Sequence, residues 1–220
     1  IREARASGLE LETLLTERPA HWRQPEWADR LCELKSFLMK RLSRLETPPP
    51  DIGLFRTRRL PPLAQALRAA RTVLVLDRVQ DPGNLGTIIR SMEALAADLL
   101  ILLPGCCSPV NDKVLRAAMG SAFRLPVAVV ATDDEALKTL AEQGFTLVAT
   151  AMNGTSITGC SFPEKIALIL GAEGRGVRPE ILAQAALQLT IPIREPVESL
   201  NVAMAATICL YERMRQRNGK

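Results

Sequence analysis

The sequence lacks the segments that mark membrane and exported proteins. No apolar run reaches the roughly 18 uninterrupted residues that a membrane-spanning helix needs. The first residues, IREARASGLELETLL, are charged and amphipathic and do not resemble a secretion signal. We therefore expect a soluble protein that acts in the cytoplasm and binds no membrane.

Cysteine and histidine are scarce, and their spacing does not match that of metal ligands. The five cysteines are odd in number, form no CxxC pair and lie mostly in apolar surroundings; they are Cys32, Cys106, Cys107, Cys160 and Cys209. This pattern favours reduced core thiols over a disulfide framework, and it predicts no metal site. The only histidine, His21, lies near the start, so the rest of the chain lacks the commonest general base.

The positive charge is unevenly distributed along the chain. Residues 1–70 hold 13 Lys and Arg against 9 Asp and Glu, whereas residues 71–220 hold 15 of each. A basic front end on a neutral body indicates an anionic partner, although a solvated helical surface explains the charge equally well. The candidate contacts are Lys35, Lys40, Arg41 and Arg44 along an expected helix, and Arg56, Arg58 and Arg59 beside an expected domain joint.

The chain changes pattern between residues 60 and 70. Before this point, helical patterns cover residues 9–15 and 28–45, and the stretch TPPPDIGLFRTRRLPP then disfavours a continuous helix. With 47% hydrophobic residues, the chain can bury one ordinary domain and a smaller one. We place the domains at residues 1–65 and 66–220.

The second domain alternates short apolar runs with helical patterns. The runs, rich in Val, Ile and Leu, cover residues 71–77, 97–103, 125–130, 145–150, 165–171 and 187–193. The helical patterns cover residues 84–96, 111–122, 133–144 and 178–186, and a last one starts at Ser199. Strands that are apolar on both faces and alternate with helices predict an α/β fold with a parallel sheet. Ligands bind such sheets at the carboxyl ends of the strands.

Polar residues follow the first of these strands, in DRVQDPGNLGTIIR. Asp81, Pro82 and Gly83 suit a turn, Asn84 suits a helix cap, and Arg90 stands on an otherwise apolar helix. A capping loop would let Asn84 fold back toward the turns that carry Arg90. A surface arginine with a capping asparagine explains this stretch equally well.

A second polar loop, ILGAEGRGVRPEIL, contains glycines without a phosphate-loop spacing. It matches neither GxGxxG nor GxxxxGK[ST], and it holds a carboxylate, Glu173, at the end of a strand. A phosphate cradle rarely carries an acid there, so Glu173 indicates a non-phosphorylated or cationic ligand.

A third polar group, ESLN, interrupts the stretch IPIREPVESLNVAMAATICLYERMRQR. Ser199 suits a helix cap, and Asn201 lies within the first turn. Capping explains Ser199 by itself. It does not explain why polar residues follow several different strands, as Asn84, Arg90, Glu173, Glu198, Ser199 and Asn201 do.

Together, DPGNLGTIIR, LILGAEGRGV and IPIREPVESLNVAMAATICLYE resemble the three signature motifs of the SpoU/TrmH branch of the SPOUT RNA methyltransferases. The resemblance covers residues 71–217, and it departs from the family pattern at Val177, where Leu is usual. It implies a C-terminal trefoil knot, which general topology rules would exclude. It also implies that residues 1–60 belong to a small α/β RNA-binding domain, which we expect to be truncated because the chain begins at Ile1 rather than Met.

The resemblance further implies S-adenosyl-L-methionine as cofactor and a ribose 2′-hydroxyl of RNA, ribosomal RNA in preference to transfer RNA, as methyl acceptor. By motif position, the cofactor-binding residues are Thr150, Ala151, Gly171, Ile191 and Leu200, and the catalytic residues are Arg90, Asn84, Glu173, Ser199 and Asn201.

The family assigns activation of the hydroxyl to Arg90. Because arginine almost never loses its proton, we expect it to stabilise the forming alkoxide, with an RNA phosphate as a candidate proton acceptor. Asn84 and Glu173 are expected to orient Arg90.

Two other functions and the oligomeric state stay open at this point. The chain could be a different α/β enzyme that binds a nucleotide at the glycines of residues 171–176, or an RNA-binding module without activity.

We expect a homodimer through the first-motif helix and an apolar face of the last helix, although that face could instead be intramolecular core. The face comprises Val202, Ala205, Ala206, Cys209 and Leu210.

Overall fold

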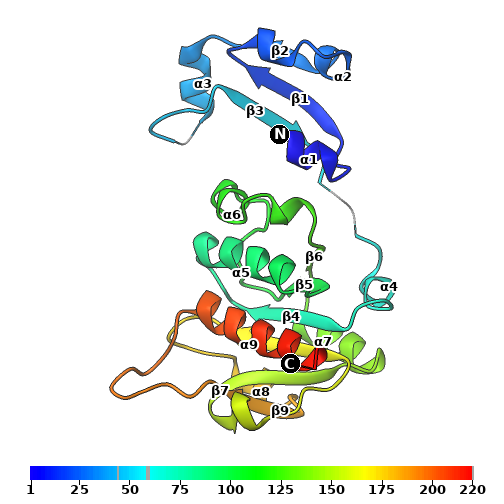
Figure 1. The fold of residues 1–220 in the computed structure, drawn as a ribbon, viewed down its shortest axis with the longest axis vertical. Helices are drawn as coiled ribbons and strands as arrows, with labels where there is room; N and C mark the ends of the chain where they lie inside the picture. Colours follow the sequence, from blue (N-terminus) through cyan, green and yellow to red (C-terminus); the bar gives the residue numbers. More distant parts are fainter. Residues whose placement is uncertain (44, 58–59, 220) are drawn as a thin grey trace. The chain divides into compact units, whose positions relative to one another are not determined.

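The computed structural model describes residues 1–43, 45–57 and 60–219 (Figure 1). The chain divides into two compact units, Ile1–Arg59 and Leu60–Lys220. Arg44, Arg58 and Arg59, which the charge pattern singles out, lie outside the described residues. Within the described ranges, no helix is long and apolar enough to cross a lipid bilayer.

The first unit is built on a three-stranded sheet. The central strand β1 (Leu11–Thr16) runs parallel to β2 (Leu31–Glu33) and antiparallel to β3 (Asp51–Phe55). The helical segments are α1 (Arg2–Ala6), η1 (Pro19–Trp22), α2 (Pro25–Ala28) and α3 (Ser36–Leu42). This unit is therefore an α/β structure with its own small core.

The helices expected in the first unit are wrong for residues 9–15 and only partly right for residues 28–45. The first segment forms β1, because Leu11 and Leu14 pack against Trp22 and Trp27 while both backbone edges pair with neighbouring strands. A seven-residue segment is too short for local helix propensity to compete with that pairing. In the second segment, β2 precedes a helix limited to α3.

The second unit contains a six-stranded sheet in which every strand pair is parallel. Its strand order is β6-β5-β4-β8-β7-β9. The strands are β4 (Thr72–Asp77), β5 (Leu99–Leu102), β6 (Val127–Val129), β7 (Thr146–Ser156), β8 (Ile166–Gly171) and β9 (Leu187–Thr190). This arrangement confirms the predicted parallel α/β fold.

Helices cover both faces of this sheet. They are α4 (Leu63–Ala66), α5 (Pro82–Ala94), α6 (Asp112–Ala117), η2 (Ser121–Phe123), α7 (Asp133–Glu142), η3 (Ile157–Gly159), α8 (Pro179–Leu182) and α9 (Val202–Arg217). Along β4, Leu74 and Leu76 face the core shared with α5, α6 and α9, whereas Val73 and Val75 face the core shared with α7 and α8. The alternation explains why the strands are apolar throughout.

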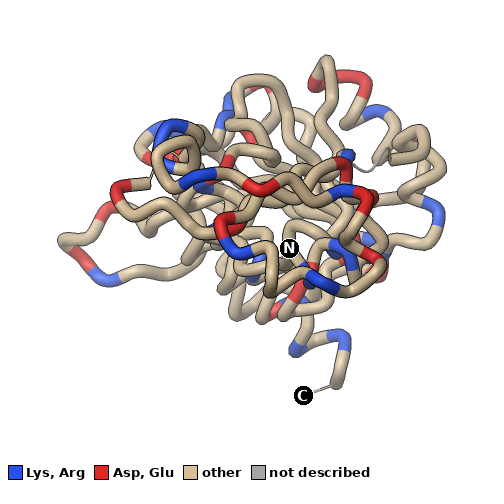
Figure 2. The backbone as a smooth tube through the Cα atoms, turned by 90° about the horizontal axis from the view of Figure 1, so that it is seen from above, with Lys and Arg blue, Asp and Glu red and all other residues tan. Residues whose placement is uncertain are grey.

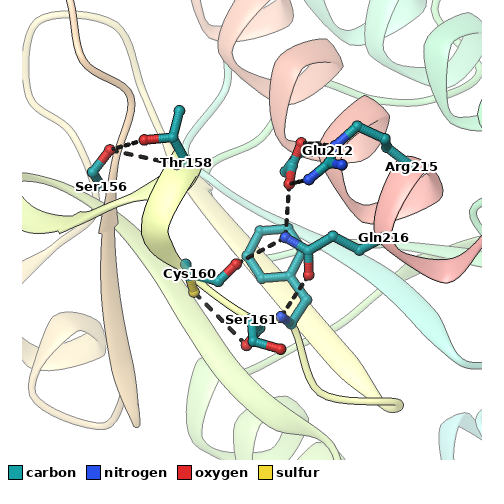
Figure 3. Close-up of polar contacts among 8 residues, drawn as sticks. Ser156, Thr158, Cys160, Ser161, Glu212, Arg215 and Gln216 are labelled. Atoms are coloured by element: carbon teal, nitrogen blue, oxygen red, sulfur yellow. Dashed lines mark hydrogen bonds and ion pairs between the residues drawn. The ribbon is translucent and has the colours of Figure 1, made fainter. Parts of the chain in front are cut away.

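The C-terminal end of the last helix, α9, is hydrogen-bonded to the segment that follows β7 (Figure 3). The Gln216 side chain donates to the carbonyl of Cys160 at 2.8 Å and accepts from the backbone N–H of Phe162 at 2.8 Å. It also donates to Glu212 at 2.7 Å, and Glu212 in turn accepts hydrogen bonds from Arg215. These bonds fix the far end of a helix whose first residue lies beside the polar motifs.

Candidate active site

Three of the predicted catalytic residues meet at the carboxyl ends of the strands. The Asn84 side-chain amide, on the first turn of α5, donates to Glu173 Oε1 at 2.7 Å. The Asn201 amide, at the start of α9, donates to the same Glu173 oxygen at 2.7 Å and to Asn84 Oδ1 at 3.0 Å. The structure therefore joins one residue from each of the three sequence motifs in a closed set of hydrogen bonds.

The helix caps differ from the two that the sequence suggests. Asp81, not Asn84, caps α5: its side chain accepts from the Asn84 backbone N–H at 2.8 Å, because Pro82 starts the helix earlier. This bond lowers the pKa of Asp81. Asn201, not Ser199, caps α9, and its Oδ1 accepts from the N–H groups of Ala203 and Met204. Because the cap occupies Oδ1, the amide nitrogen of Asn201 is left to face Glu173 and Asn84.

Arg90 lies apart from this set of hydrogen bonds. It follows Asn84 by six residues on α5, which places it about 9 Å along the helix and roughly a third of a turn around it. Its side chain is exposed, and among the described residues it makes no hydrogen bond or ion pair. The expectation that Asn84 and Glu173 orient Arg90 is therefore wrong within one chain, because their polar groups bind each other and Asn201 instead.

A cavity of about 430 Å³ adjoins the three hydrogen-bonded residues. All five residues predicted to bind the cofactor line it, together with Glu173 and Ser199; the five are Thr150, Ala151, Gly171, Ile191 and Leu200. The cavity lies within the size range of small-molecule sites. The cofactor assignment of these residues stays a prediction, but the structure gathers them around one space.

The wall of this cavity depends on a glycine at the end of β8. A Cβ atom on Gly171 would lie 1.9 Å from the backbone carbon of Gly176, so no other residue fits there without moving the loop. Gly174 and Gly176 have φ values of 73° and 65°, in the left-handed region that glycine adopts readily. The glycine spacing therefore serves a tight backbone turn, bridged between Ala172 and Gly176, around Glu173.

Other lining residues were not singled out from the sequence as cofactor ligands. Arg175 and Glu198 bring charges of both signs to the cavity, and Met152 lies at its edge with 69% of its surface exposed. Arg175 lies between Gly174 and Gly176 of the second polar loop, so its position in the sequence offered a signal. Met152 offered none, because it belongs to an extension of β7 beyond the predicted strand end.

The residues that the structure describes include no group of three or more His, Cys, Asp or Glu side chains placed to hold a metal ion. The five cysteines are free. Burial raises the pKa of the Cys106 thiol to about 11 and that of Cys209 to about 12, so both are protonated near neutral pH. The described residues that line the cavity include apolar and polar side chains and no cysteine.

Comparisons with known proteins identify the family of this chain. The SpoU rRNA Methylase family matches residues 71–211. The chain is 41% identical over 148 residues to the 23S rRNA (guanosine(2553)-2′-O)-methyltransferase RlmP of Bacillus subtilis, covering 67% of this chain and 59% of that protein. The chain belongs to the SpoU rRNA methylase family, as the motif resemblance indicated. It spans somewhat more than half the length of such curated relatives.

Two solved structures resemble nearly the whole chain. One is an rRNA methyltransferase from Sinorhizobium meliloti with AdoMet bound, which has a TM-score of 0.87 and 29% identity, with 98% of this chain and 84% of that chain covered. The other is the SpoU methyltransferase AviRb from Streptomyces viridochromogenes in complex with AdoMet, which has a TM-score of 0.86 and 27% identity, with 99% and 87% covered. Both units of the chain therefore have counterparts within single known proteins.

Proposed function

We propose that this protein transfers a methyl group from S-adenosylmethionine to a ribose 2′-hydroxyl of RNA, with ribosomal RNA as its substrate class. The observation that carries this proposal is the hydrogen-bonded set of Asn84, Glu173 and Asn201 beside the cavity that the five predicted cofactor residues line. Relatives named as 23S rRNA 2′-O-methyltransferases and neighbours with AdoMet bound support the same reaction.

The residues of the cavity suit this cofactor. Leu170, Leu189 and Val202 give it an apolar lining, which suits a flat base, and the carboxylates of Glu173 and Glu198 favour cationic groups such as a sulfonium or an ammonium. Arg175 supplies a positive charge for a carboxylate. When bound, S-adenosylmethionine would supply an electrophilic methyl carbon.

The polar residues have two tasks in such a reaction. Asn84, Glu173 and Asn201 hold the start of α5, the loop after β8 and the start of α9 in one arrangement, which positions the acceptor against the cavity. Arg90 keeps its positive charge and stabilises the alkoxide as the 2′-oxygen loses its proton. Ser199 lines the cavity and shapes its entrance. An RNA phosphate accepts the proton.

The active form is a homodimer, but through a different face of α9 from the one that the sequence suggested. Val202, Ala206, Cys209 and Leu210 are buried in the domain core, with Ala205 packed against it, so they cannot meet a second chain. Met204, Ile208 and Tyr211 instead form an apolar stripe at helical spacing and are 56%, 38% and 54% exposed.

Arg90 lies on the helix beside this stripe. The Ser91 and Thr207 hydroxyls, 2.8 Å apart, join α5 to α9, and Arg90 is the exposed neighbour of Ser91. A second copy seated on the stripe would therefore come next to Arg90. This placement supports a role for Arg90 at a site completed by dimerisation, because it explains why the side chain lies apart from Asn84 and Glu173.

The first unit binds RNA through α3. Lys35, Lys40 and Arg41 are exposed there beside the exposed aromatic ring of Phe37, a combination that suits phosphates and an unpaired base. Arg56 suits this role less, because Glu12 and Glu10 pair with it. Figure 2 shows positive and negative residues interspersed along much of the chain. Overall charge therefore does not single out an RNA-binding surface, and α3 is proposed because its basic residues lie beside an exposed aromatic ring.

Two further features of the family belong to this proposal. The segment after β9 passes through the loop after β8 as a trefoil knot, which the shared lining of one cavity by both segments supports. The protein acts in the cytoplasm, where its ribosomal RNA substrate is found, and its free cysteines suit that compartment.

The test has two separable parts. Calorimetry on the purified protein should show binding of S-adenosylmethionine and of its demethylated product without RNA. Transfer of a tritiated methyl group to ribosomal RNA, followed by digestion to nucleosides and mass spectrometry, should then yield a 2′-O-methylnucleoside. Transfer RNA serves as the matched substrate control, and a base-methylated product in place of the ribose product would contradict the assignment.

The rival functions give different results in the same experiments. A nucleotide-binding enzyme would bind ATP or a dinucleotide at the loop of residues 171–176 and leave S-adenosylmethionine unbound. An RNA-binding module without activity would retain RNA and produce no methylated nucleoside from any RNA offered.

A further inference from the structure

A buried ion pair joins the end of β4 to the end of the loop that follows β8. The Asp77 carboxylate is fully buried, and its two oxygens accept from the Arg178 backbone N–H at 2.9 Å and from Arg178 Nε at 2.8 Å. The two residues are 101 positions apart in the chain. A carboxylate at this depth is tolerated only when it is hydrogen-bonded or paired, and Arg78 Nε, 3.4 Å from Asp77 Oδ1, adds a longer ionic contact to the two from Arg178.

The same aspartate also lies beside the residue where this loop begins. Asp77 is the register partner of Gly171, the last residue of β8, in the parallel β4–β8 pair. The chain leaves the sheet at Gly171, passes through Glu173, and returns to Asp77 at Arg178. Asp77 therefore meets both ends of this loop, Gly171 through its backbone and Arg178 through its carboxylate, and the middle of the loop lines the cavity and binds Asn84 and Asn201.

A second acid holds the guanidinium of Arg178 from the other side. Asp133, at the first turn of α7, lies 2.7 Å from Arg178 Nη2. Burial disfavours the charge of Arg178, but the contacts of its guanidinium with the carboxylates of Asp133 and Asp77 outweigh burial and raise its pKa. The side chain thus connects the loop to β4 and to α7.

We propose that Asp77 and Arg178 are positioning residues that hold the loop of residues 171–177 in its cofactor-binding form. Without the pair, the returning end of the loop is released from β4, Glu173 shifts relative to Asn84 and Asn201, and one wall of the cavity opens. The proposal rests on the proposed function in one respect, which is that S-adenosylmethionine occupies this cavity. Precise placement of such a wall matters because small displacements cost binding and rate disproportionately.

The chain offers a matched control for the Arg178→Gln variant. Arg213 is 5% exposed, against 19% for the side chain of Arg178, and it hydrogen-bonds to the other end of the same strand, with its Nε 3.2 Å from Thr72 Oγ1. It does not belong to the loop and does not line the cavity. Arg213→Gln therefore removes an arginine that binds β4 without releasing the loop.

Two measurements on these variants test whether Arg178 positions the loop of residues 171–177. We expect Arg178→Gln to weaken S-adenosylmethionine binding by about ten-fold or more in calorimetry, with Arg178→Lys recovering part of the loss and Arg213→Gln leaving affinity nearly unchanged. In the ligand-free protein, amide hydrogen exchange across residues 171–178 should accelerate in Arg178→Gln and stay unchanged in Arg213→Gln. Both variants should lower the melting temperature, so a stability loss alone does not count as support.

The outcomes separate this proposal from the proposed function. If the unaltered protein does not bind S-adenosylmethionine, the proposed function fails, and the exchange measurement alone still tests whether the pair holds the loop. Unchanged exchange and affinity in folded Arg178→Gln, or equal changes in Arg213→Gln, would overturn the positioning role. Should Arg178→Gln not fold, Asp77→Asn, which keeps the shape of the side chain and removes its charge, takes its place under the same criteria.

Discussion

Asn84 and Asn201, 117 residues apart in the chain, are joined by a hydrogen bond of 3.0 Å between their side-chain amides. Each also donates to the same oxygen of Glu173, and Asn201 in addition caps α9. The start of the last helix is therefore built into the same contacts that order the candidate active site. At Asn201, substitutions can therefore test separately the helix cap, which supports stability, and the side-chain amide, which belongs to the candidate active site.

Replacing Asn201 with Asp should lower activity far more than stability. Aspartate caps helices as well as asparagine does, so the free energy of unfolding should change little from the cap itself. Its carboxylate donates no hydrogen bond and would repel Glu173. Asn201→Ala, the comparison variant, should cost about 1 kcal/mol in urea unfolding through loss of the cap. Methyl-transfer rates of both should fall, and full activity in Asn201→Asp would remove the amide from the mechanism.

Arg90→Ala should abolish methyl transfer and leave cofactor affinity nearly unchanged, because Arg90 does not line the cavity. Loss of one group that stabilises a developing negative charge typically lowers kcat by about 100-fold or more. Single-turnover rates and calorimetry on the same preparation measure the two effects. Arg90→Lys keeps the charge without the planar fork and is expected to be intermediate. Near-normal rates in Arg90→Ala would exclude it from the reaction.

Tyr211→Asp should weaken the dimer, because it places a charge on the exposed stripe of α9. The dissociation constant of the dimer should rise by about ten-fold or more, since buried tyrosines often carry much of the binding energy at interfaces. Val110→Asp is the control, because Val110 is similarly exposed, at 57%, and is separate from α9. Light scattering across a dilution series measures both. A monomeric unaltered protein with full activity would contradict the dimer.

Changing Lys35, Lys40 and Arg41 together to Ala should weaken RNA binding and flatten its salt dependence. Each lost phosphate contact reduces the slope of log affinity against log salt by about 0.7 to 0.9. Arg56→Ala should have a smaller effect, because Glu10 and Glu12 already pair with that arginine. S-adenosylmethionine affinity should not change in either variant. An unaltered slope in the triple variant would move the RNA surface to another part of the chain.

Glu212 should contribute to stability above mildly acidic pH and lose this contribution in acid. The hydrogen bond from Arg215 is the main cause that lowers the pKa of Glu212 from 4.5 to about 2, with Gln216 adding to it (Figure 3). A depressed folded-state pKa means that the contribution is complete above pH 4.5 and disappears as pH falls toward about 2. The stability difference between the unaltered protein and Glu212→Gln should therefore shrink across this window. Urea unfolding at several pH values measures it.

Much of the second unit could be predicted from the sequence. Six short apolar runs separated by helical patterns specify a parallel sheet, because strands covered on both faces need apolar residues throughout. That fold brings strand ends together, so Asn84, Glu173 and Asn201 could be placed at one edge before any contact was known. The sequence was less informative for residues 9–15, where a short amphipathic pattern fits either a helix or a strand.

The tertiary structure decided what depends on partners distant in the chain. Which face of α9 is buried and where Arg90 lies follow from packing between α5, α9 and the sheet, and local patterns do not encode that packing. The Asp77–Arg178 pair is the clearest case, because a buried carboxylate is stable only beside its donors and those donors arrive 101 residues later. The sequence thus determined the layers and the residue types at the strand ends, whereas only folding determined which of them touch.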